Sequence, residues 1–191
     1  GLNRYNGTDF YVFRPVKGDK NSLYNNNIGT ICGDKQGHIY IRCKYAVVEY
    51  DIKKNTFHTI RDNDIQAITY DNARLWVCTR DSLFTYNRVE DRLDYYYNLE
   101  GVRMSCVTED SAGNLYVGTM NNGLYMIDHD KKWLSYFPKK DITCIYEDSK
   151  KSIWVGTKDD GLFRLDRNGG ITNYGTAPHQ NMLSSSYVRC V

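Results

Sequence analysis

Two pairs of adjacent carboxylates have the residue types that acid–base catalysis needs. They are Glu109-Asp110 and Glu147-Asp148, and a pair of carboxylates is what glycoside hydrolases use as acid and base. Both pairs lie at the same point of successive sequence repeats, where a strand is expected to enter a turn. One catalytic site needs one pair, whereas every repeat needs a turn, in which Asp side chains accept hydrogen bonds from nearby backbone N–H groups. We therefore interpret both pairs as turn residues and expect no catalytic residue.

Metal and cofactor chemistry finds no support in the sequence either. Asp159-Asp160-Gly161 and Asp128-x-Asp130 lack the alternating ligands and the closing Glu of a calcium loop. The histidines do not pair with one another at i, i+2 or i, i+4, and no cysteine lies at zinc-finger spacing from them. There are four of them, His38, His58, His129 and His179. We expect no bound metal and no cofactor.

Internal repetition decides which elements must position these residues. Residues 142–157 align without a gap with residues 104–119, and weaker copies cover residues 65–79 and 28–43. Successive copies end about 36 to 40 residues apart, which is the period of propeller blades. No stretch has the 3.6-residue stripe of an amphipathic helix, so helical repeats are excluded.

Each repeat is expected to form four short strands, because alternating apolar residues are punctuated by Gly, Asn and Asp. In the last complete repeat the expected elements are strand A at 142–146, a polar turn at 148–152, strand B at 153–156, a loop at 158–160, strand C at 162–165 and strand D around 171–174. Asn6-Gly7 and Asn168-Gly169 predict two-residue hairpin turns, since both residue types tolerate a positive φ.

The predicted fold class is therefore an all-β propeller with four-stranded antiparallel blades. We expect an incomplete propeller, of about four full blades and a partial blade at each end. The expected divisions are the end of a first blade and a linker at 1–27, blades at 28–64, 65–101, 102–141 and 142–186, and the first strand of a further blade at 187–191. Open blade edges predict two kinds of partner, the remainder of the propeller or a second copy of this chain.

Equivalent positions in the repeats predict which side chains are buried. Trp76, Tyr116 and Trp154 share a place in strand B with apolar neighbours, so we expect all three to lie between adjacent blades. The strand-A position that holds Thr30 and Ala67 in the early repeats holds a cysteine in the later ones, namely Cys106, Cys144 and Cys190. We expect a small buried side chain at that position, and free thiols rather than disulfides.

A group of aromatic residues could stack on a base or a sugar. Tyr95-Tyr96-Tyr97 lies near Arg92, and Trp133 occupies the equivalent strand of the next repeat. These residues fall on the outermost strand of their blades, where alternate side chains pack between neighbouring blades. We therefore favour packing over a stacking platform.

The loops between strands B and C vary in chemistry while the strands around them repeat, as in a scaffold that carries grafted specificity. In a propeller these loops ring one mouth of the central channel. Their Lys, Arg, Asn and Tyr side chains would suit a hydroxyl-rich or anionic sugar, and solvated turns are the alternative. The candidate ligand-binding residues are Lys44, Tyr45, Arg80, Asn121, Asn122, Lys158, Asp159 and Asp160.

The pattern Asp148-x4-Ile-Trp-Val-Gly-Thr-x3-Gly-Leu-x3-Asp166 resembles the two-component regulator propeller repeat. The resemblance covers nearly the whole chain and is weaker in the first two repeats, where Gly-Thr becomes Arg42-Cys43 and Cys78-Thr79. It implies the N-terminal periplasmic sensor region of a hybrid two-component system, in which a sensor histidine kinase is joined to a response regulator. The implied role is non-catalytic: this part of an inner-membrane protein's ectodomain would help to detect glycan-derived oligosaccharides and relay the signal to a cytoplasmic kinase.

Composition excludes other classes of protein. Lys and Arg number 25 against 23 Asp and Glu, a net charge of +2, so no strong field favours nucleic acid. No run approaches the ~20 apolar residues of a membrane helix, and we expect no membrane contact by this part of the protein. Two alternatives to a sensor remain. One is a propeller-type polysaccharide lyase or glycosidase, which needs an asymmetric cluster of His, Tyr, Arg and carboxylate; the other is a protein-interaction scaffold.

Overall fold

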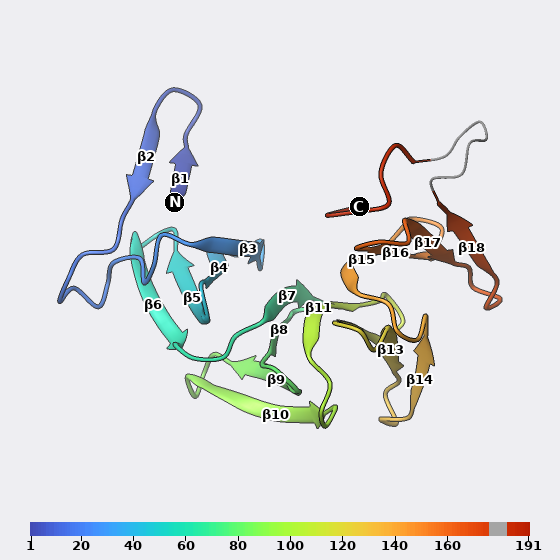
Figure 1. Ribbon diagram of the computed structural model, residues 1–191. Coiled ribbons are helices and arrows are strands. Elements are labelled where there is room, and N and C mark those ends of the chain that lie inside the picture. Colours follow the sequence, from blue (N-terminus) through green and yellow to red (C-terminus); the bar gives the residue numbers. More distant parts are fainter. Residues whose placement is uncertain (176–182) are drawn as a thin grey trace. The chain divides into compact units, whose positions relative to one another are not determined.

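The computed structural model describes residues 1–175 and 183–191, and all regular structure in these residues is β-strand (Figure 1). Each strand pairs antiparallel with its neighbour in the sequence, so that the strand order within every sheet follows the chain. The chain divides into two compact units, Gly1–Tyr96 and Tyr97–Val191, which are described in turn.

The first unit contains a hairpin and two four-stranded sheets. The hairpin pairs β1 (Leu2–Tyr5) with β2 (Phe10–Phe13). Blade I consists of β3 (Ile28–Gly33), β4 (His38–Cys43), β5 (Ala46–Asp51) and β6 (Thr56–Arg61). Blade II consists of β7 (Ala67–Asp71), β8 (Arg74–Cys78), β9 (Ser82–Asn87) and β10 (Arg92–Asn98), the last of which runs on into the second unit.

The second unit contains two further four-stranded sheets. Blade III consists of β11 (Met104–Glu109), β12 (Leu115–Thr119), β13 (Leu124–Ile127) and β14 (Trp133–Tyr136). Blade IV consists of β15 (Ile142–Glu147), β16 (Ile153–Thr157), β17 (Leu162–Leu165) and β18 (Ile171–Tyr174). The repeat in sequence is a repeat in register, because Cys106 lies opposite Gly118 in blade III as Cys144 lies opposite Gly156 in blade IV. The all-β propeller fold class is confirmed.

The Gly-Thr pair at the end of strand B recurs for two physical reasons. A Cβ on Gly118 or Gly156 would collide with the sulfur of the facing cysteine on strand A. The threonine closes the loop that follows, since the Thr119 hydroxyl donates to the Gly123 carbonyl at 2.6 Å and Thr157 does the same to Gly161 at 2.7 Å. Strand pairing and loop closure are therefore set by the same two residues.

The carboxylates at the end of strand A cap turns, as their repetition predicts. Asp110 Oδ1 accepts the backbone N–H groups of Ala112 and Asn114, and Asp148 Oδ1 accepts those of Lys150 and Ser152, all at 2.8–2.9 Å. Glu147, which precedes Asp148 in the sequence, has another role. Its carboxylate accepts hydrogen bonds from the backbone N–H and the hydroxyl of Ser111, which belongs to blade III. The interpretation of these pairs as turn residues is confirmed for both aspartates.

The core of each unit lies between the faces of successive sheets. Buried Tyr40, Ile65 and Val77 belong to the cluster between blades I and II, and Leu124, Phe137 and Val155 to the cluster between blades III and IV. Of the three strand-B aromatics, Trp76 and Tyr116 are buried, but Trp154 is only half-buried, and the prediction for it is wrong. Its ring stacks on Tyr174 of its own blade, so no second sheet of the described residues covers it.

The two predicted hairpin turns are longer than two residues. Tyr5 pairs with Phe10, which leaves a four-residue loop, and Leu165 pairs with Ile171, which leaves five. Both loops are organised by an Asx side chain. Asn6 Oδ1 accepts two backbone N–H groups in the first loop, and Asp166 Oδ1 accepts two in the second.

Two further expectations need correction. Residues 187–191 form no strand, although the Val188 N–H donates to the Thr157 carbonyl at 3.0 Å. Of the strand-A cysteines, Cys106 and Cys144 are half-buried and Cys190 is exposed, because it lies in this strandless stretch. All six cysteines are free thiols. Burial raises the pKa of the Cys106 thiol to about 12, so this sulfur stays protonated and unreactive at neutral pH.

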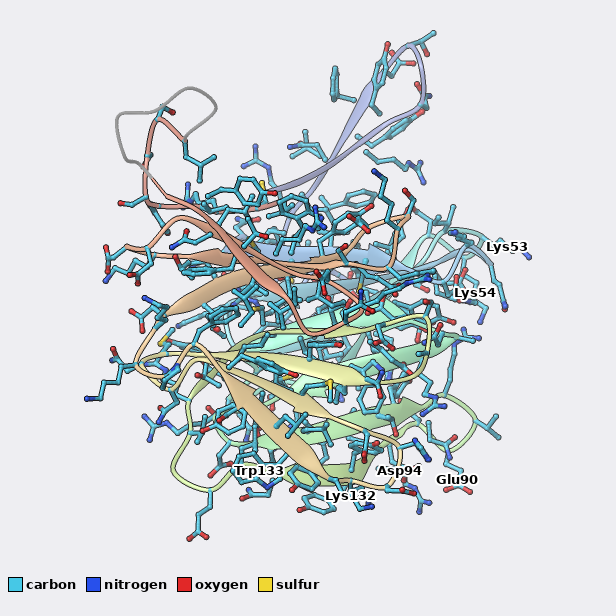
Figure 2. The ribbon with its side chains drawn as sticks, turned by 90° about the vertical axis from the view of Figure 1, so that its right-hand side faces the viewer. Lys53, Lys54, Glu90, Asp94, Lys132 and Trp133 are labelled. Carbon is cyan, nitrogen blue, oxygen red and sulfur yellow. The ribbon has the colours of Figure 1, made fainter. Side chains whose placement is uncertain are left out.

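The turns between strands C and D carry charged side chains into solvent. Lys53 and Lys54 project from the turn after β5, and Glu90 and Asp94 lie on the β9–β10 hairpin (Figure 2). Arg92 makes ion pairs of 2.8 Å with both of these acids, so its guanidinium is not part of a stacking platform.

The aromatic residues of the outermost strands divide between packing and exposure. Tyr96 packs edge-on against Trp76, with 4.8 Å between ring centroids, as the packing interpretation predicts. Tyr95 and Trp133 are 64% and 52% exposed, so for these two that interpretation is wrong. The reason is the two-residue period of a strand, which turns alternate side chains of an outermost strand away from the sheet core.

Candidate functional site

All eight predicted ligand-binding residues are exposed side chains on the loops between strands B and C. Three belong to the first unit and five to the second. The first three are Lys44, Tyr45 and Arg80, and the other five are Asn121, Asn122, Lys158, Asp159 and Asp160.

In the first unit, the connection between blades I and II holds these loops. The Tyr45 carbonyl accepts the N–H of Ile65 at 2.9 Å, and Asp64 Oδ2 accepts the N–H of Arg80 at 3.3 Å. The Lys44 ammonium lies 5.8 Å from the centroid of the Tyr45 ring, which is a cation–π distance. Asp64 and Ile65, which are adjacent in the connection, thus hold the Arg80 loop and the Lys44-Tyr45 loop at the same edge of this unit.

In the second unit, Asp141 plays the same part for blades III and IV. Its Oδ1 accepts the N–H of Asn121 at 2.6 Å, and its backbone carbonyl accepts the N–H of Lys158 at 3.0 Å. Lys140, next to it, makes a 2.6 Å ion pair with Asp160. A hollow of about 430 Å3 lies beside Lys158, with Asp141 in its wall. Asn121 and Lys158 are therefore both held by Asp141, and Asp160 by its neighbour Lys140, whereas Asn122 and Asp159 are simply exposed.

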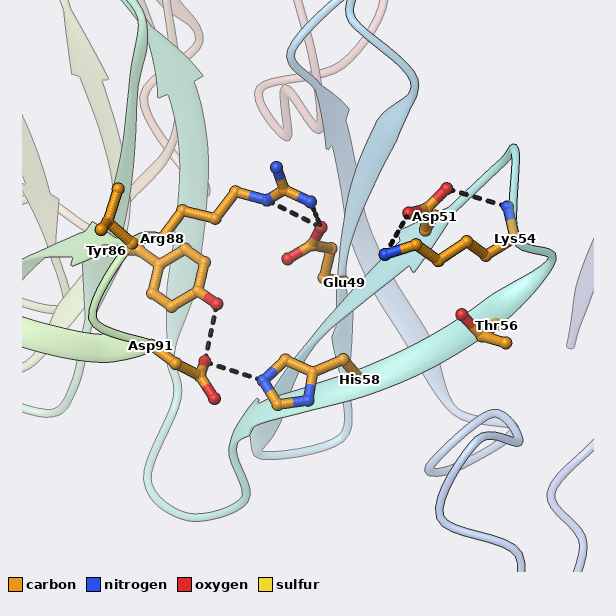
Figure 3. Close-up of a pocket in the computed structure, with 9 residues that line it drawn as sticks. Glu49, Asp51, Lys54, Thr56, His58, Tyr86, Arg88 and Asp91 are labelled. Carbon is orange, nitrogen blue, oxygen red and sulfur yellow. Dashed lines mark hydrogen bonds and ion pairs between the residues drawn. The ribbon is translucent and has the colours of Figure 1, made fainter.

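A second candidate site, which the sequence analysis did not identify, lies between blades I and II. It is a cleft of about 630 Å3 that we call the blade I–II cleft (Figure 3). Blade I contributes side chains from β5, β6 and the turn between them, and blade II from the end of β9 and the turn after it. The polar residues drawn there are Glu49, Asp51, Lys54, Thr56, His58, Tyr86, Arg88 and Asp91.

A buried carboxylate and a guanidinium cross from one blade to the other in this cleft. Arg88 Nε and Nη2 donate to Glu49 Oε1 at 3.1 and 2.9 Å, and the Glu49 side chain is only 7% exposed. The hydrogen bond to Glu49 raises the pKa of Arg88, so the guanidinium stays charged. His38 Nε2 lies 3.9 Å from the same oxygen, while His38 Nδ1 is 2.5 Å from Asp34 Oδ2.

A second set of contacts forms the other wall of the cleft. The Tyr86 hydroxyl donates to Asp91 Oδ1 at 2.7 Å, and His58 Nε2 lies 2.8 Å from the same oxygen. These two hydrogen bonds lower the pKa of Asp91, which is therefore ionised. Burial, together with the nearby Asp91 carboxylate, raises the pKa of Tyr86, so the phenol is held as a hydrogen-bond donor and not as a base.

This polar cluster lies between blades I and II, and the equivalent positions of blade III are apolar. The register pairs Glu49 with His58 across β5 and β6, and the equivalent pair across β13 and β14 is Met126 with Leu134. Alignment of the repeats shows what the other blades hold at the position of Glu49, namely Thr85, Met126 and Arg164. His58 and Asp91 lie 33 residues apart, so local spacing could not reveal their contact. Because this position holds a different residue in each blade, the sequence repeat carries no signal for the site.

The structure gives no sign of a metal centre in the residues it describes. Across residues 1–175 and 183–191, no three His, Cys, Asp or Glu side chains gather where they could hold an ion. His179 lies outside these residues. In the same part of the chain, no helix is long and apolar enough to cross a membrane.

The fold and the loop-bearing edges define a β-propeller whose B–C loops are built to present polar side chains. Residues 136–159, which run from the end of β14 to the Lys158 loop, match the family described as two component regulator propeller. The chain therefore contains a two-component regulator propeller region. No curated protein matches it.

Solved structures of similar fold include extracellular domains of two-component systems and a lyase. The extracellular domain of the hybrid two component system BT3049 from B. thetaiotaomicron superposes with a TM-score of 0.80 at 20% identity, over 99% of this chain and 27% of that one. The corresponding domain of BT4673 from the same organism gives 0.72 at 12% identity, over 86% and 24%. Virginiamycin B lyase from Staphylococcus aureus gives 0.67 at 14% identity, over 80% and 56%. The chain thus spans about a quarter of the two ectodomains.

Proposed function

We propose that this chain is part of the sensor propeller of a hybrid two-component system, where it helps to detect glycan-derived oligosaccharides. The observation that carries the proposal is the two-component regulator propeller match, which falls on β15, β16 and the Lys158 loop. The likeness in fold to two such ectodomains supports it. In this role the chain lies in the periplasm and acts by binding, and the signal passes to a cytoplasmic kinase elsewhere in the protein.

The B–C loops offer the mixture of groups that a sugar needs. A sugar hydroxyl both donates and accepts, so it is matched by amides, ammonium groups and carboxylates that lie close together. In the second unit Lys158 lines the 430 Å3 hollow, and the backbones of Asn121, Lys158 and Asp160 are fixed by Asp141 or Thr157. We assign the first contact with the oligosaccharide to this edge of blades III and IV.

Titration calorimetry with defined hexasaccharides of glucose, mannose, xylose and galacturonate tests the proposal. We expect the chain to bind at least one of the four, and Lys158→Ala to weaken that binding by about tenfold, the effect of losing one central polar contact. Lys150→Ala is the matched control, because Lys150 is an exposed lysine on the turn at the other end of β16. Heat from none of the four sugars, or equal losses in both lysine variants, would contradict the proposal.

A lyase is the second candidate function, because one observation favours it. The blade I–II cleft gathers His58, Tyr86, Arg88 and three carboxylates in a single blade pair, which is the asymmetric cluster that a lyase requires. A propeller lyase is also among the structures of similar fold. The raised pKa of Tyr86 and the pairing of Arg88 with Glu49 weigh against it. Ultraviolet absorbance of unsaturated uronate products, after incubation with polygalacturonate, would detect such an activity.

A further inference from the structure

We propose that the blade I–II cleft is a binding site for a neutral, hydroxyl-rich small molecule. The choice of a sugar among such molecules rests on the proposed function, whereas the class of ligand rests on the cleft itself. The cleft measures about 630 Å3, inside the ~300–1,000 Å3 range of small-molecule pockets.

Packing alone does not account for the polar groups between these blades. The equivalent sheet positions in blade III hold Met126, which packs against the apolar cluster between blades III and IV, and Leu134, which is exposed. Burying the Glu49 carboxylate removes it from water, and a buried ion pair is often no more stabilising than apolar residues of similar size. A charged cluster with a buried carboxylate at its centre, placed between blades I and II, is therefore better explained by what it binds.

The pairs that already exist in the cleft favour a neutral ligand. Each carboxylate in the cleft faces a basic group: Glu49 faces Arg88, Asp51 faces Lys54 at 3.5 Å, and Asp91 faces His58. An anionic ligand would meet the Glu49 carboxylate beside Arg88, and a cationic one would meet Lys54 and Arg88 beside the carboxylates. Neither contact between like charges arises for a ligand that carries only hydroxyl groups.

The groups of the cluster keep hydrogen-bonding capacity beyond their own pairs. Within the described part of the chain, Glu49 uses Oε1, Asp91 uses Oδ1 and Arg88 uses Nε and Nη2. Glu49 Oε2 and Asp91 Oδ2 are therefore available as acceptors, and Arg88 Nη1 as a donor. Adjacent hydroxyls of a sugar ring can donate to a carboxylate oxygen and accept from a guanidinium at the same time.

The test is NMR of the His58 ring, because this side chain lines the cleft and is 51% exposed. Maltose is the neutral probe, and glucosamine and galacturonate are the cationic and anionic ones. We expect maltose to shift the His58 ring resonances in a saturable way and the two charged sugars to bind at least about tenfold more weakly. A stronger response to either charged sugar, or no saturable shift with maltose, would overturn the proposal.

Variants separate binding from folding. Glu49→Met gives blade I the residue type that blade III has at this position, Met126. We therefore expect the midpoint of thermal unfolding to stay within a few degrees, while the shift of the His58 resonances with maltose is lost. Arg88→Lys keeps the positive charge but removes the paired N–H donors of the guanidinium, so we expect it to weaken maltose binding. This variant tests the site even if Glu49→Met does not fold. Arg167→Lys is the matched control, since Arg167 follows β17 as Arg88 follows β9. Unchanged maltose binding in Arg88→Lys would contradict the assignment.

The outcome is independent of the B–C loops. If the His58 shift saturates with maltose while no hexasaccharide binds at Lys158, the cleft is a site and the assignment of the sugar contact to the B–C loops fails. If the hexasaccharides bind and depend on Lys158 but the His58 resonances do not move, the proposed function stands and the cleft is only an inter-blade contact.

Discussion

Where strands A and B of a blade face each other, there is room for one side chain, which comes from one strand while the other strand carries a glycine. In blade IV the Cys144 sulfur occupies the space that a Cβ on Gly156 would need, and Val188 closes the other side at 2.9 Å from that position. Blade I makes the opposite exchange, because Gly29 lies on strand A and the Arg42 side chain of strand B fills its Cβ position. The loss of the Gly-Thr pair in blade I is thus compensated on the neighbouring strand.

We predict that Gly156→Ala destabilises the chain by about 1–3 kcal/mol, the usual penalty of overpacking. The penalty is one of space, since Gly156 does not have a positive φ. Cys144→Ala removes the sulfur that blocks the new methyl group, so adding it to Gly156→Ala should restore part of the lost stability. Denaturant midpoints of the two single variants and the double variant give the coupling directly. Additive losses would show that the two side chains do not share this space.

At the scale of the strand, burial of the strand-B aromatic distinguishes the blades. Trp76 is 1% exposed and packs edge-on against Tyr96, whereas half-buried Trp154 stacks on Tyr174 with 5.4 Å between centroids. The Trp154 ring nitrogen also donates to Asp148 Oδ2 at 2.8 Å, which ties strand B to the turn that precedes it. The same sequence position therefore holds a fully buried core residue in blade II and a half-buried residue that packs within its own blade in blade IV.

We predict that Trp76→Ala costs about 3–5 kcal/mol, as for other fully buried large aromatics. Trp154→Ala should cost clearly less, because water already reaches part of that ring. Chemical denaturation of both variants, followed by far-ultraviolet circular dichroism, measures the difference. An equal or larger loss in Trp154→Ala would mean that its ring is as well covered as that of Trp76.

Sequence reasoning located the strands well and the turns poorly, for a definable reason. Strand boundaries follow from apolar alternation, so the elements expected at 153–156 and 162–165 lie within one residue of β16 and β17. Turn length depends on one side chain that captures backbone N–H groups, as Asn6 and Asp166 do, and an Asn-Gly pair alone does not reveal it. The capping role of Asp110 and Asp148 was predictable because it repeats.

At the scale of the whole chain, the sequence repeat indicates the fold but does not indicate the site. Positions that agree between blades, such as Gly118 and Gly156, describe the scaffold. The position of Glu49 differs in every blade, and its partners Arg88 and His38 come from separate strands or turns. Contacts between residues so far apart in sequence follow from the register of whole sheets, so a search for local motifs did not find them.

We propose that this propeller binds glycan fragments and leaves them intact. The most direct measurement is to pass a mixed pool of neutral and uronate-containing oligosaccharides over the immobilised chain, and to compare the masses of applied and retained sugars by mass spectrometry. We predict that a subset of the oligosaccharides is retained and that their masses are unchanged. Retention of none of them, or retained sugars whose masses show cleavage, would contradict the claim.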